Sequence, residues 1–431
     1  MKVLVIGGGG REHALVWKLS QSPKVKQLYC APGNPGIAGI AQCVEIRPDD
    51  LSGLLSFAQT HKIDLTIVGP ELPLTLGVVD QFQQSGLRVF GPTKAASMIE
   101  ASKVYAKQFM MTYQIPTAKA QSFDSVEKAI AYAQQQQFPL VIKAEGLAAG
   151  KGVVIAQTLA EANTAIHRIM RSKVFGSAGD RIVIEEFLMG VEATVLIFTD
   201  GHGISLMPTS QDHKRLKDQD QGENTGGMGA YAPAPVVTPE IQDQVLRRIV
   251  KPTLQGLSKE GSPYKGILYV GLMICQDGPK VLEFNCRFGD PEAQVVLPLL
   301  DSDLVDVVEA VIEDRLDRLN VRWKTASAIC VVLASAGYPG EPKTGIPIDG
   351  LDQAGQIEQV FVFHAGTALR RRKVVTNGGR VIGVTALGPD LRSARDRVYQ
   401  AVDKIQFQGM QYRKDIGARA IKSKISMEES G

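Results

Sequence analysis

The N-terminal part of the chain alternates between short apolar runs and stretches with helical spacing. The runs that read as strands are residues 2–6, 27–30, 65–68 and 88–90. The helical stretches between them are residues 11–20, 51–60 and 77–85. Strands that alternate with helices form a parallel sheet covered on both faces. The turns Gly69-Pro70-Glu71 and Gly91-Pro92-Thr93 follow two strands, so we expect them at the carboxyl edge, where such sheets bind ligands.

A glycine turn, Gly7-Gly8-Gly9-Gly10, joins the first strand to the first helix. The dinucleotide-binding pattern G-x-G-x-x-G fails here, because Glu12 or His13 stands where its third glycine is required. The second strand also lacks the acid that binds a ribose in that fold. A glycine turn before a helix still favours an anion, most simply a monophosphate. Tight packing of strand on helix is the alternative explanation for these glycines.

A second glycine-rich segment lies between predicted strands at 139–143 and 153–156. It reads Glu145-Gly146-Leu147-Ala148-Ala149-Gly150-Lys151-Gly152. It is not a P-loop, because three residues separate its first two glycines and no Ser or Thr follows Lys151. The segment is typical of a mobile hairpin tip that closes over a triphosphate, with Lys143 as a second phosphate partner. An ordinary flexible hairpin is the alternative.

The predicted strand at 280–287 is the most polar one in the chain. Alternation along a strand places Glu283, Asn285 and Arg287 on one face and Leu282, Phe284 and Cys286 on the other. A carboxylate and an amide oxygen are hard ligands that suit Mg²⁺ on nucleotide phosphates. The guanidinium beside them suits a carboxylate or a phosphoryl group. A plain amphipathic strand is the alternative.

Two further segments are candidates for binding. Residues 211–229 are too long and too polar for an ordinary connection, and they contain Asp212-His213-Lys214-Arg215 and Asn224-Thr225-Gly226-Gly227. These groups suit a phosphorylated sugar or an acyl phosphate, unless they form a solvated basic turn. Glu185-Glu186-Phe187-Leu188 ends a strand and is placed to border an adenine, unless its acids are simply solvated.

Composition limits the class of protein. A chain of 431 residues exceeds one hydrophobic core, and 44% hydrophobic with 22% charged residues is typical of a soluble globular protein. A net charge of +3 gives no footprint for nucleic acid, and no apolar run reaches the length of a membrane span. Five cysteines without C-x-x-C spacing indicate a reduced, cytoplasmic protein and argue against zinc and disulfides.

Further helices are predicted at 94–113, 125–137, 292–300 and 302–316, and further strands at 181–185, 193–199 and 268–275. After Trp323 the sequence becomes rich in strands, with turns such as Asn377-Gly378-Gly379. The run Arg370-Arg371-Arg372-Lys373 is predicted to be a solvated hairpin tip.

The order of Lys143, the glycine-rich hairpin, the 185–188 segment and Glu283-Phe284-Asn285-x-Arg287 resembles the ATP-grasp superfamily. Other segments resemble one of its families, the phosphoribosylamine–glycine ligases, also called glycinamide ribonucleotide synthetases. These segments are Gly9-Gly10-Arg11-Glu12-His13-Ala14, Ala31-Pro32-Gly33-Asn34-Pro35-Gly36, Val68-Gly69-Pro70-Glu71, residues 210–215 and 224–231, Arg287-Phe288-Gly289-Asp290-Pro291-Glu292 and His364-Ala365-Gly366-Thr367. The resemblance runs from residue 1 to about residue 422.

The resemblance implies a multidomain fold of α/β and α+β type. A Rossmann-like pre-ATP-grasp domain with a doubly wound parallel sheet would cover 1–102. An ATP-grasp domain would cover 103–323, with a small mobile ATP-binding lid at 116–192. A strand-rich α+β domain at 324–431 would complete the active site.

The activity implied is the ATP-dependent joining of glycine to 5-phosphoribosylamine through glycyl phosphate. The products would be glycinamide ribonucleotide, ADP and phosphate, in de novo purine biosynthesis. An amine cannot displace oxide from a carboxylate at neutral pH, so activation by ATP is chemically reasonable. Implied cofactors are ATP and Mg²⁺ or Mn²⁺. The expected partners are the two small substrates, with no nucleic acid or membrane, and the expected state is a monomer or weak dimer.

The resemblance also implies a role for each matching residue. Glu283 and Asn285 would hold the metal. Residues implied to bind ATP are Lys103, Lys143, Gly146, Gly150, Lys151, Gly152, Glu185, Glu186, Phe187, Leu188 and Glu192. Residues implied to bind the other substrates are Gly9, Gly10, Arg11, Gly33, Asn34, Gly36, Pro70, Glu71, Lys214, Arg215, Asn224, Thr225, Gly226, Gly227, Arg287, Gly289 and Asp290. Those implied in catalysis are Arg287, Lys143, Asp212 and His213.

The chain departs from the family in three places. Gly8 stands where members usually carry Asn, so an amide that would touch phosphate is absent. Glu145 stands where Asp is common, and residues 270–274 lack the extra acid of many ATP-grasp enzymes, which leaves a second metal ion open. Three alternatives stay open: another ATP-grasp ligase such as a purine carboxylation enzyme or a biotin carboxylase, a nucleotide-sensing protein without turnover, and a dehydrogenase, which the failed fingerprint disfavours.

Overall fold

The structure is a computed structural model that describes residues 1–147 and 152–421. Its N-terminal part is a parallel sheet in the order β3-β2-β1-β4-β5. The strands are β1 (Lys2–Gly7), β2 (Gln27–Pro32), β3 (Gln42–Cys43), β4 (Leu65–Val68) and β5 (Val89–Phe90), and the helices are α1 (Gly10–Leu19), α2 (Leu51–Thr60), α3 (Glu71–Leu76) and α4 (Val78–Gln84). The predicted parallel sheet is confirmed. The short β3 and α3 were not predicted, because two to six residues carry no periodic signal.

The central sheet has the order β11-β10-β16-β17 and is antiparallel. Its strands are β10 (Val191–Thr199), β11 (Ile204–Leu206), β16 (Gly266–Cys275) and β17 (Gly278–Asn285), and α9 (Pro239–Val245) and α10 (Lys251–Lys259) lie between β11 and β16 in sequence. The prediction that Leu282 packs with Phe284 and Cys286 is wrong. The register shifts by one residue at Leu282, so Val281 is buried in its place and Leu282 borders a cleft.

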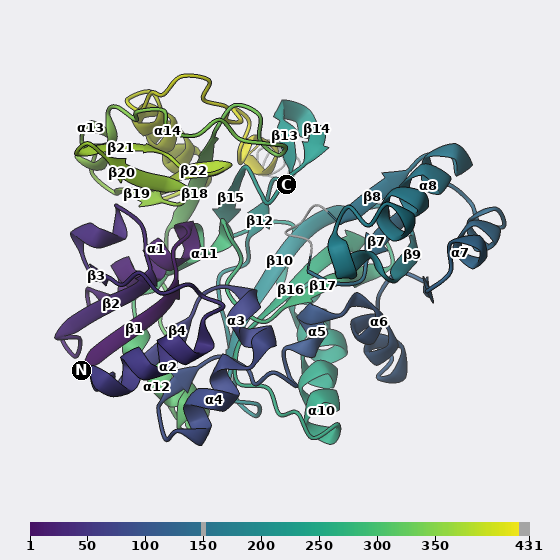
Figure 1. The fold of residues 1–431 in the computed structure, drawn as a ribbon, viewed down its shortest axis with the longest axis horizontal. Coiled ribbons are helices and arrows are strands. Elements are labelled where there is room, and N and C mark those ends of the chain that lie inside the picture. The colour runs from purple at the N-terminus through teal and green to yellow at the C-terminus, as the bar shows by residue number, and fades with distance from the viewer. Residues whose placement is uncertain (148–151, 422–431) are drawn as a thin grey trace.

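A separate small sheet, ordered β6-β9-β7-β8, lies at the right of Figure 1 and belongs to the segment for which a lid was predicted. Its strands are β6 (Ala120–Phe123), β7 (Leu140–Ala144), β8 (Val153–Ala156) and β9 (Ile182–Glu186), and its helices are α7 (Val126–Ala133) and α8 (Leu159–Ile166). The pairing of β7 with β8 confirms the predicted hairpin. The lid has its own hydrophobic cluster, which lets it pack independently of the central sheet.

The C-terminal sheet has the order β12-β15-β18-β22-β19 and is antiparallel. Its strands are β12 (Gln211–Asp212), β15 (Gly229–Ala232), β18 (Ser327–Ala334), β19 (Val360–His364) and β22 (Arg380–Gly388), accompanied by α13 (Leu351–Gly355) and α14 (Leu391–Val402). A hairpin of β20 (Thr367–Arg370) and β21 (Lys373–Thr376) confirms that the basic run is an exposed tip. Residues 211–229 are not one long loop, since they form β12 and a hairpin of β13 (Arg215–Lys217) and β14 (Gln221–Asn224).

The predicted helix boundaries needed correction. The helix expected at 94–113 is two helices, α5 (Met98–Ala101) and α6 (Lys103–Thr112), because Ser102 is extended and its hydroxyl caps α6 by accepting from Tyr105 N. The helix expected at 125–137 ends at Ala133. The helix expected at 292–300 is α11 (Glu292–Val296), which tightens into a 3₁₀ turn over Leu297–Leu299. The helix expected at 302–316 is α12 (Leu304–Ile312).

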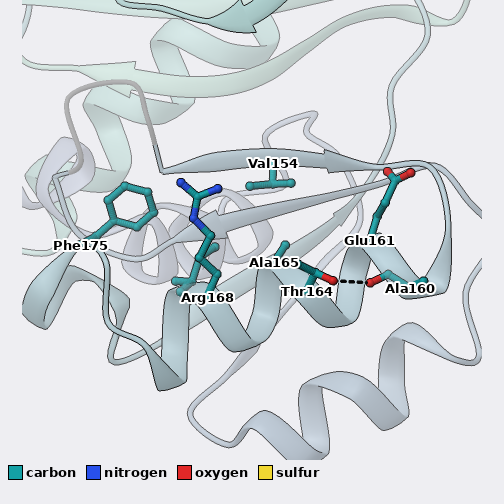
Figure 2. Close-up of a pocket in the computed structure, with 8 residues that line it drawn as sticks. Val154, Ala160, Glu161, Thr164, Ala165, Arg168 and Phe175 are labelled. Carbon is teal, nitrogen blue, oxygen red and sulfur yellow. Dashed lines mark hydrogen bonds between the residues drawn. The ribbon is translucent and has the colours of Figure 1, made fainter. Parts of the chain in front are cut away.

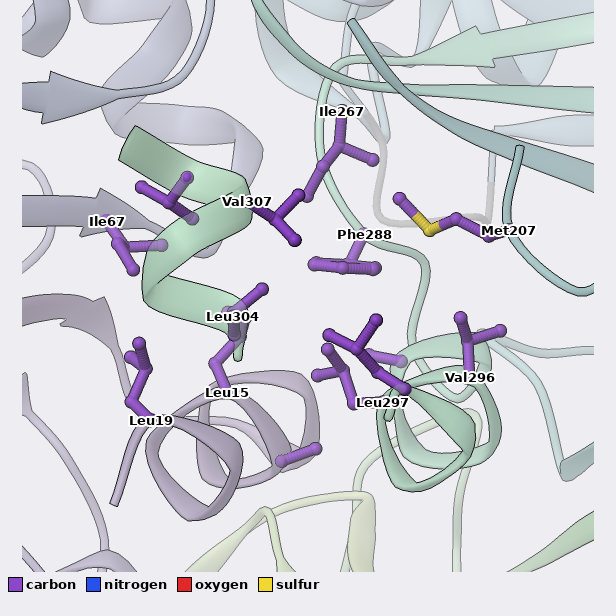
Figure 3. Packing of buried hydrophobic residues seen from close by; sticks show 14 of the residues in the cluster. Leu15, Leu19, Ile67, Met207, Ile267, Phe288, Val296, Leu297, Leu304 and Val307 are labelled. Carbon is purple, nitrogen blue, oxygen red and sulfur yellow. The ribbon is translucent and has the colours of Figure 1, made fainter. Parts of the chain in front are cut away.

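One hydrophobic cluster ties the N-terminal sheet to the segment that follows β17. Figure 3 shows Leu15 and Leu19 of α1 near Leu304 of α12, and Phe288 and Leu297 belong to the same buried cluster. This packing holds the segment after Arg287 against α1. In the described part of the chain no helix is long and apolar enough to cross a membrane.

Candidate active site

A cleft of about 1260 Å³ lies where the lid, the central sheet and the two terminal parts meet. It gathers residues that are far apart in the sequence. The predicted site residues that line it are Arg11, Glu71, Lys103, Lys143, Gly152, Glu185, Glu186, Phe187, Leu188, Glu192, Asp212, His213, Lys214, Arg215, Asn224, Thr225, Gly226, Glu283, Asn285, Arg287, Gly289 and Asp290. Gly150 and Lys151 lie outside the described residues.

The carboxylate of Glu283 faces this cleft without a hydrogen bond or ion pair to any described residue. Burial alone would raise the pKa of Glu283, but the charges of Lys214, Lys143 and other cations outweigh it and lower the pKa. Glu283 is therefore a carboxylate held ionised with its oxygens unused. Such a group is available to a cation.

Asn285 lies two residues further along β17. The amide orientation that satisfies its hydrogen bonds has the nitrogen donating to Glu100 Oε1 at 2.9 Å and to Phe284 O at 3.2 Å. The amide oxygen then points the other way. Within the described residues no group of three or more His, Cys, Asp or Glu is arranged to hold a metal. A metal bound here would take the Glu283 and Asn285 oxygens and complete its shell with phosphate and water, which fits Mg²⁺.

Arg287 is held from the N-terminal part of the chain. Its Nη2 lies 2.9 Å from Glu100 Oε1, and its Nε lies 3.3 Å from Glu71 Oε2. Glu100 also accepts a 2.6 Å hydrogen bond from the backbone N–H of Cys286. Burial raises the pKa of Glu100 to about 6 against the opposing charge of Arg287. Glu100 was not predicted, because it stands alone in an apolar stretch without any motif.

Glu185 is the centre of a second buried charge cluster. Lys143 Nζ lies 3.0 Å from one of its oxygens and Lys107 Nζ lies 3.2 Å from the other, while only 2% of Glu185 is exposed. Lys143 also donates to Leu282 O at 3.1 Å, which joins the lid to β17. Burial lowers the pKa of Lys107 to about 8. Lys107 was missed, since a lysine within a helix usually reads as a solvated residue.

Lys103 connects the start of α6 to the glycine-rich hairpin. Its Nζ donates to Gly146 O at 3.0 Å, and burial lowers its pKa. The linker after β9 contributes Phe187, which is 38% exposed, and Leu188 to the cleft wall. Glu192, in β10, pairs with Lys214 at 3.2 Å, so the start of β10 and the 211–226 region meet at the cleft.

Acidic groups gather beyond Arg287. Burial raises the pKa of Asp212 to about 7, although the charge of Lys214 opposes this shift. Glu292 accepts a 3.0 Å hydrogen bond from the Tyr269 hydroxyl and lies in the same cleft. His213 is half-buried, its Nδ1 is buried without a partner in the described chain, and desolvation together with Arg413 lowers its pKa to about 4. This histidine is therefore neutral at pH 7.

The turn before α1 is occupied by carboxylates of the protein itself. Gly9 N donates to Glu12 Oε2 at 2.6 Å, and Arg11 N lies 3.5 Å from Asp290 Oδ2. Asn34 donates to Gly8 O and His364 O, which fixes the turn to the C-terminal sheet. Eight predicted residues of the described part are not among those that line the cleft: the substrate candidates Gly9, Gly10, Gly33, Asn34, Gly36, Pro70 and Gly227, and the nucleotide candidate Gly146.

Arg380, from β22, was not predicted either. Its Nη1 donates to Gly226 O and to Asp290 O, both at 2.6 Å. Burial would raise the pKa of Asp290, but Arg380 and Arg11 outweigh it and lower the pKa. Arg380 therefore joins the C-terminal part to the turn after Arg287. A single arginine in a strand gives no sequence signal for such a role.

Three family models match the chain. They are described as phosphoribosylglycinamide synthetase N domain, over residues 1–100, ATP-grasp (A) domain, over 101–293, and C domain, over 328–419. Curated relatives named phosphoribosylamine–glycine ligase extend over almost the full chain. One from Caldanaerobacter subterraneus is 49% identical and covers 97% of this chain and 100% of its own length. One from Synechocystis is 51% identical and covers 98% and 100%.

Solved structures agree with this. A phosphoribosylamine–glycine ligase from Thermotoga maritima is similar with a TM-score of 0.84 and 32% identity, covering 96% of this chain and 100% of its own. The biotin carboxylase domain of a Hydrogenobacter thermophilus 2-oxoglutarate carboxylase has a TM-score of 0.73 at 15% identity, covering 95% and 91%. That second likeness concerns the fold alone. The chain belongs to the phosphoribosylamine–glycine ligase family.

Proposed function

We propose that the cleft activates glycine as glycyl phosphate and then transfers the glycyl group to 5-phosphoribosylamine. As a member of its family, the chain is an ATP-dependent ligase that makes glycinamide ribonucleotide in purine biosynthesis. The observation that supports the proposal most is the unpaired, ionised carboxylate of Glu283 beside Asn285 and Arg287. This arrangement is suited to phosphoryl transfer, which depends on positioning and charge neutralisation.

Family membership implies ATP with a divalent metal ion, and we propose Mg²⁺, or Mn²⁺ in its place. Glu283 and Asn285 would hold the ion against the nucleotide phosphates. When bound, it would neutralise charge that develops on the transferred phosphoryl group. A single site is proposed, because β16 offers no acid opposite this pair.

ATP would lie between the lid and β17. Lys103 and Lys143 are proposed to bind its phosphates, together with the Gly146–Gly152 hairpin, whose residues Gly150 and Lys151 lie outside the described part. The adenosine would contact the linker and the acids at its two ends: Glu185, Glu186, Phe187, Leu188 and Glu192. Backbone groups of a linker that follows a strand are accessible to an adenine edge, which supports this placement.

The carboxylate of glycine would attack the γ-phosphoryl group of ATP beside Arg287. In the first step a glycine carboxylate oxygen bonds to phosphorus and ADP leaves. In the second the amine bonds to the carbonyl carbon and phosphate leaves with that oxygen. We propose that Arg287 neutralises the acyl phosphate, and that Asp212, whose pKa is near 7, takes the proton that the amine loses. His213 would act as a neutral hydrogen-bonding group.

The phosphorylated sugar would occupy the end of the cleft formed by the 211–226 region. Lys214, Arg215, Asn224, Thr225 and Gly226 line that end, with Gly227 next to them in sequence. Arg11, Glu71, Gly289 and Asp290 would complete the substrate wall. Gly9, Gly10, Gly33, Asn34, Gly36 and Pro70 would shape this wall from behind. A division into 1–102, 103–323 and 324–431 belongs to the same proposal, with Arg380 as the contribution of the last part.

Isotope transfer tests the proposed intermediate. Glycine labelled with ¹⁸O in both carboxylate oxygens is supplied with ATP, Mg²⁺ and phosphoribosylamine, and the inorganic phosphate is isolated. One ¹⁸O atom per phosphate is expected, since the carboxylate oxygen leaves with phosphorus. Unlabelled phosphate would show that glycine is not activated by phosphorylation.

A further inference from the structure

The hairpin of β13 and β14 carries two substrate groups but has little packing of its own. Among the described strands, β13 and β14 pair only with each other. Arg215 lies at the start of β13 and Asn224 at the end of β14, and both line the cleft. Most residues between them are exposed. Something other than a hydrophobic core must therefore hold this hairpin over the cleft.

The base of the hairpin is fixed by polar contacts. Gly226 N donates to the Tyr338 hydroxyl at 2.9 Å, and Arg380 donates to Gly226 O. Thr225 N donates to Lys214 O at 2.7 Å, which closes the two strands at this end. The base is thus attached to the C-terminal sheet.

The tip is fixed by a segment from the C-terminal end of the described chain. Arg413, with a fully buried side chain, donates to Asp220 Oδ1 at 2.8 Å and forms two further bonds to Asp415, at 2.7 and 2.8 Å. Asp415 in turn accepts from Gln219 N at 2.8 Å, and Asp218 accepts from Lys414 N at 2.7 Å. Four polar contacts therefore converge on the three tip residues Asp218, Gln219 and Asp220, when the ion pair of Arg419 with Asp220 is included.

The backbone of the tip requires this support. Gln219 and Asp220 have φ values of 58° and 53°, which is the left-handed region that side chains disfavour. Two successive non-glycine residues in this region persist only where surrounding contacts hold them. The Gln219 N–H and the Asp220 carboxylate are the groups that residues 413–415 engage.

Residues 413–415, called the clamp below, are themselves anchored to α14 in the C-terminal part. The Tyr399 hydroxyl of α14 donates to Arg413 O at 2.8 Å and accepts from Ile416 N at 3.2 Å. Arg413 also reaches Arg215 O at 3.3 Å, so it contacts the strand that carries a cleft residue. The buried guanidinium of Arg413 thus bonds both to the hairpin and to its own segment, and such a rigid group is suited to fix how the two lie against each other.

We infer that Arg413 is a positioning residue, which holds the β13–β14 hairpin in place and thereby sets the affinity for the phosphorylated amine substrate. This inference rests on the proposed assignment of Lys214, Arg215, Asn224 and Thr225 to that substrate. Arg413 does not line the cleft, so it acts through the hairpin. Binding of ATP involves the lid and β17 and is not expected to depend on it.

The experiment compares Arg413→Met, Arg413→Lys and Asp220→Asn with a control, Arg47→Met, which removes an exposed arginine from an ion pair with Asp49. Asp220→Asn is included because Asp220 is 39% exposed, so this variant keeps the buried arginine and folds even if Arg413→Met does not. Two quantities are measured for each: amide hydrogen exchange of peptides that cover 215–224, and the KM values for ATP, glycine and phosphoribosylamine.

We expect Arg413→Met and Asp220→Asn to speed exchange in the hairpin and to raise the KM for phosphoribosylamine by about tenfold or more, with little change in the KM for ATP. Arg413→Lys should restore part of the affinity, because it keeps one ion pair. Unchanged hydrogen exchange in the hairpin, or an equal rise of all three KM values, would overturn the inference that Arg413 positions the hairpin. Faster exchange with all KM values unchanged would instead overturn the assignment of this hairpin to substrate.

Discussion

Arg287 and Glu100 form a 2.9 Å ion pair that joins the segment directly after β17 to α5. Glu100 also binds the backbone at Cys286 and the amide of Asn285. One carboxylate therefore orients the arginine proposed to neutralise the acyl phosphate and the amide proposed to bind the metal. Glu100 also lines the cleft, so it holds both groups from the wall of the site.

Glu100→Gln should lower kcat while leaving the KM for ATP nearly unchanged. The amide keeps an acceptor for Cys286 N but loses the charge that fixes Arg287. A reduction of about 10- to 100-fold is expected for a misplaced electrostatic partner. Steady-state kinetics checks this, with Glu313→Gln, an exposed acid paired with arginines, as the control. Equal kcat values in the wild type and Glu100→Gln would contradict the positioning role.

Glu283→Ala should abolish most of the turnover while the fold persists. The carboxylate has no structural partner among the described residues, so its removal leaves no buried group unpaired. We expect kcat to fall by about 10²–10³-fold or more. Asn285→Ala should behave similarly and also raise the Mg²⁺ concentration needed for half-maximal activity. Circular dichroism confirms folding, and near-wild-type turnover in both variants would refute the metal site.

Lys107→Met should weaken the binding of ATP more than it lowers kcat. The substitution leaves Glu185 with Lys143 alone, so Lys143 is drawn away from the phosphates toward the buried carboxylate. The KM for ATP is expected to rise by about tenfold, as for a lost charge partner. Lys62→Met serves as a control, since Lys62 is an exposed lysine in a turn. An unchanged KM for ATP would show that Lys107 only supports the local packing.

The pH dependence follows from Asp212 and Glu100. Both pKa values are raised by burial, to about 7 and about 6, so each group gains a proton as the pH falls through its value. Protonated Asp212 cannot accept a proton, and protonated Glu100 releases Arg287. The turnover should therefore fall below pH 7 and fall more steeply below pH 6. Asp212→Asn should lower the maximal turnover and abolish the fall in turnover near pH 7. If turnover of this variant still falls near pH 7, another group causes that fall.

The sequence predicted the parts of the fold that have a local period. Alternation along β17 placed Glu283, Asn285 and Arg287 together on the cleft side, as the structure shows. The position of Leu282 was wrong, because the bulge depends on the register with β16, which one strand cannot reveal. The break at Ser102 was missed for a related reason, since the extended residue is stabilised by contacts to the lid, such as that of its hydroxyl with Glu145.

The candidate site was predicted where it lies on motifs and missed where it depends on tertiary contacts. Lys143, Glu185 and Arg287 stand in recognisable segments, and the structure brings them to one cleft. Glu100 and Arg380 come from ordinary-looking helix and strand residues, and their roles appear only when distant segments meet. The glycine turn at residues 7–10 was expected to face an anion, and carboxylates of the protein lie next to it: Gly9 N donates to Glu12, and Arg11 N, in α1, lies near Asp290.

The release of ADP tests the central claim most directly. Purified protein is incubated with ATP and Mg²⁺, and ADP is measured with glycine alone, with freshly generated phosphoribosylamine alone, and with both. ADP formed only when both are present is the predicted result for a ligase that protects its acyl phosphate until the amine arrives. Steady ADP release without the amine, or no release under any combination, would contradict the proposed reaction.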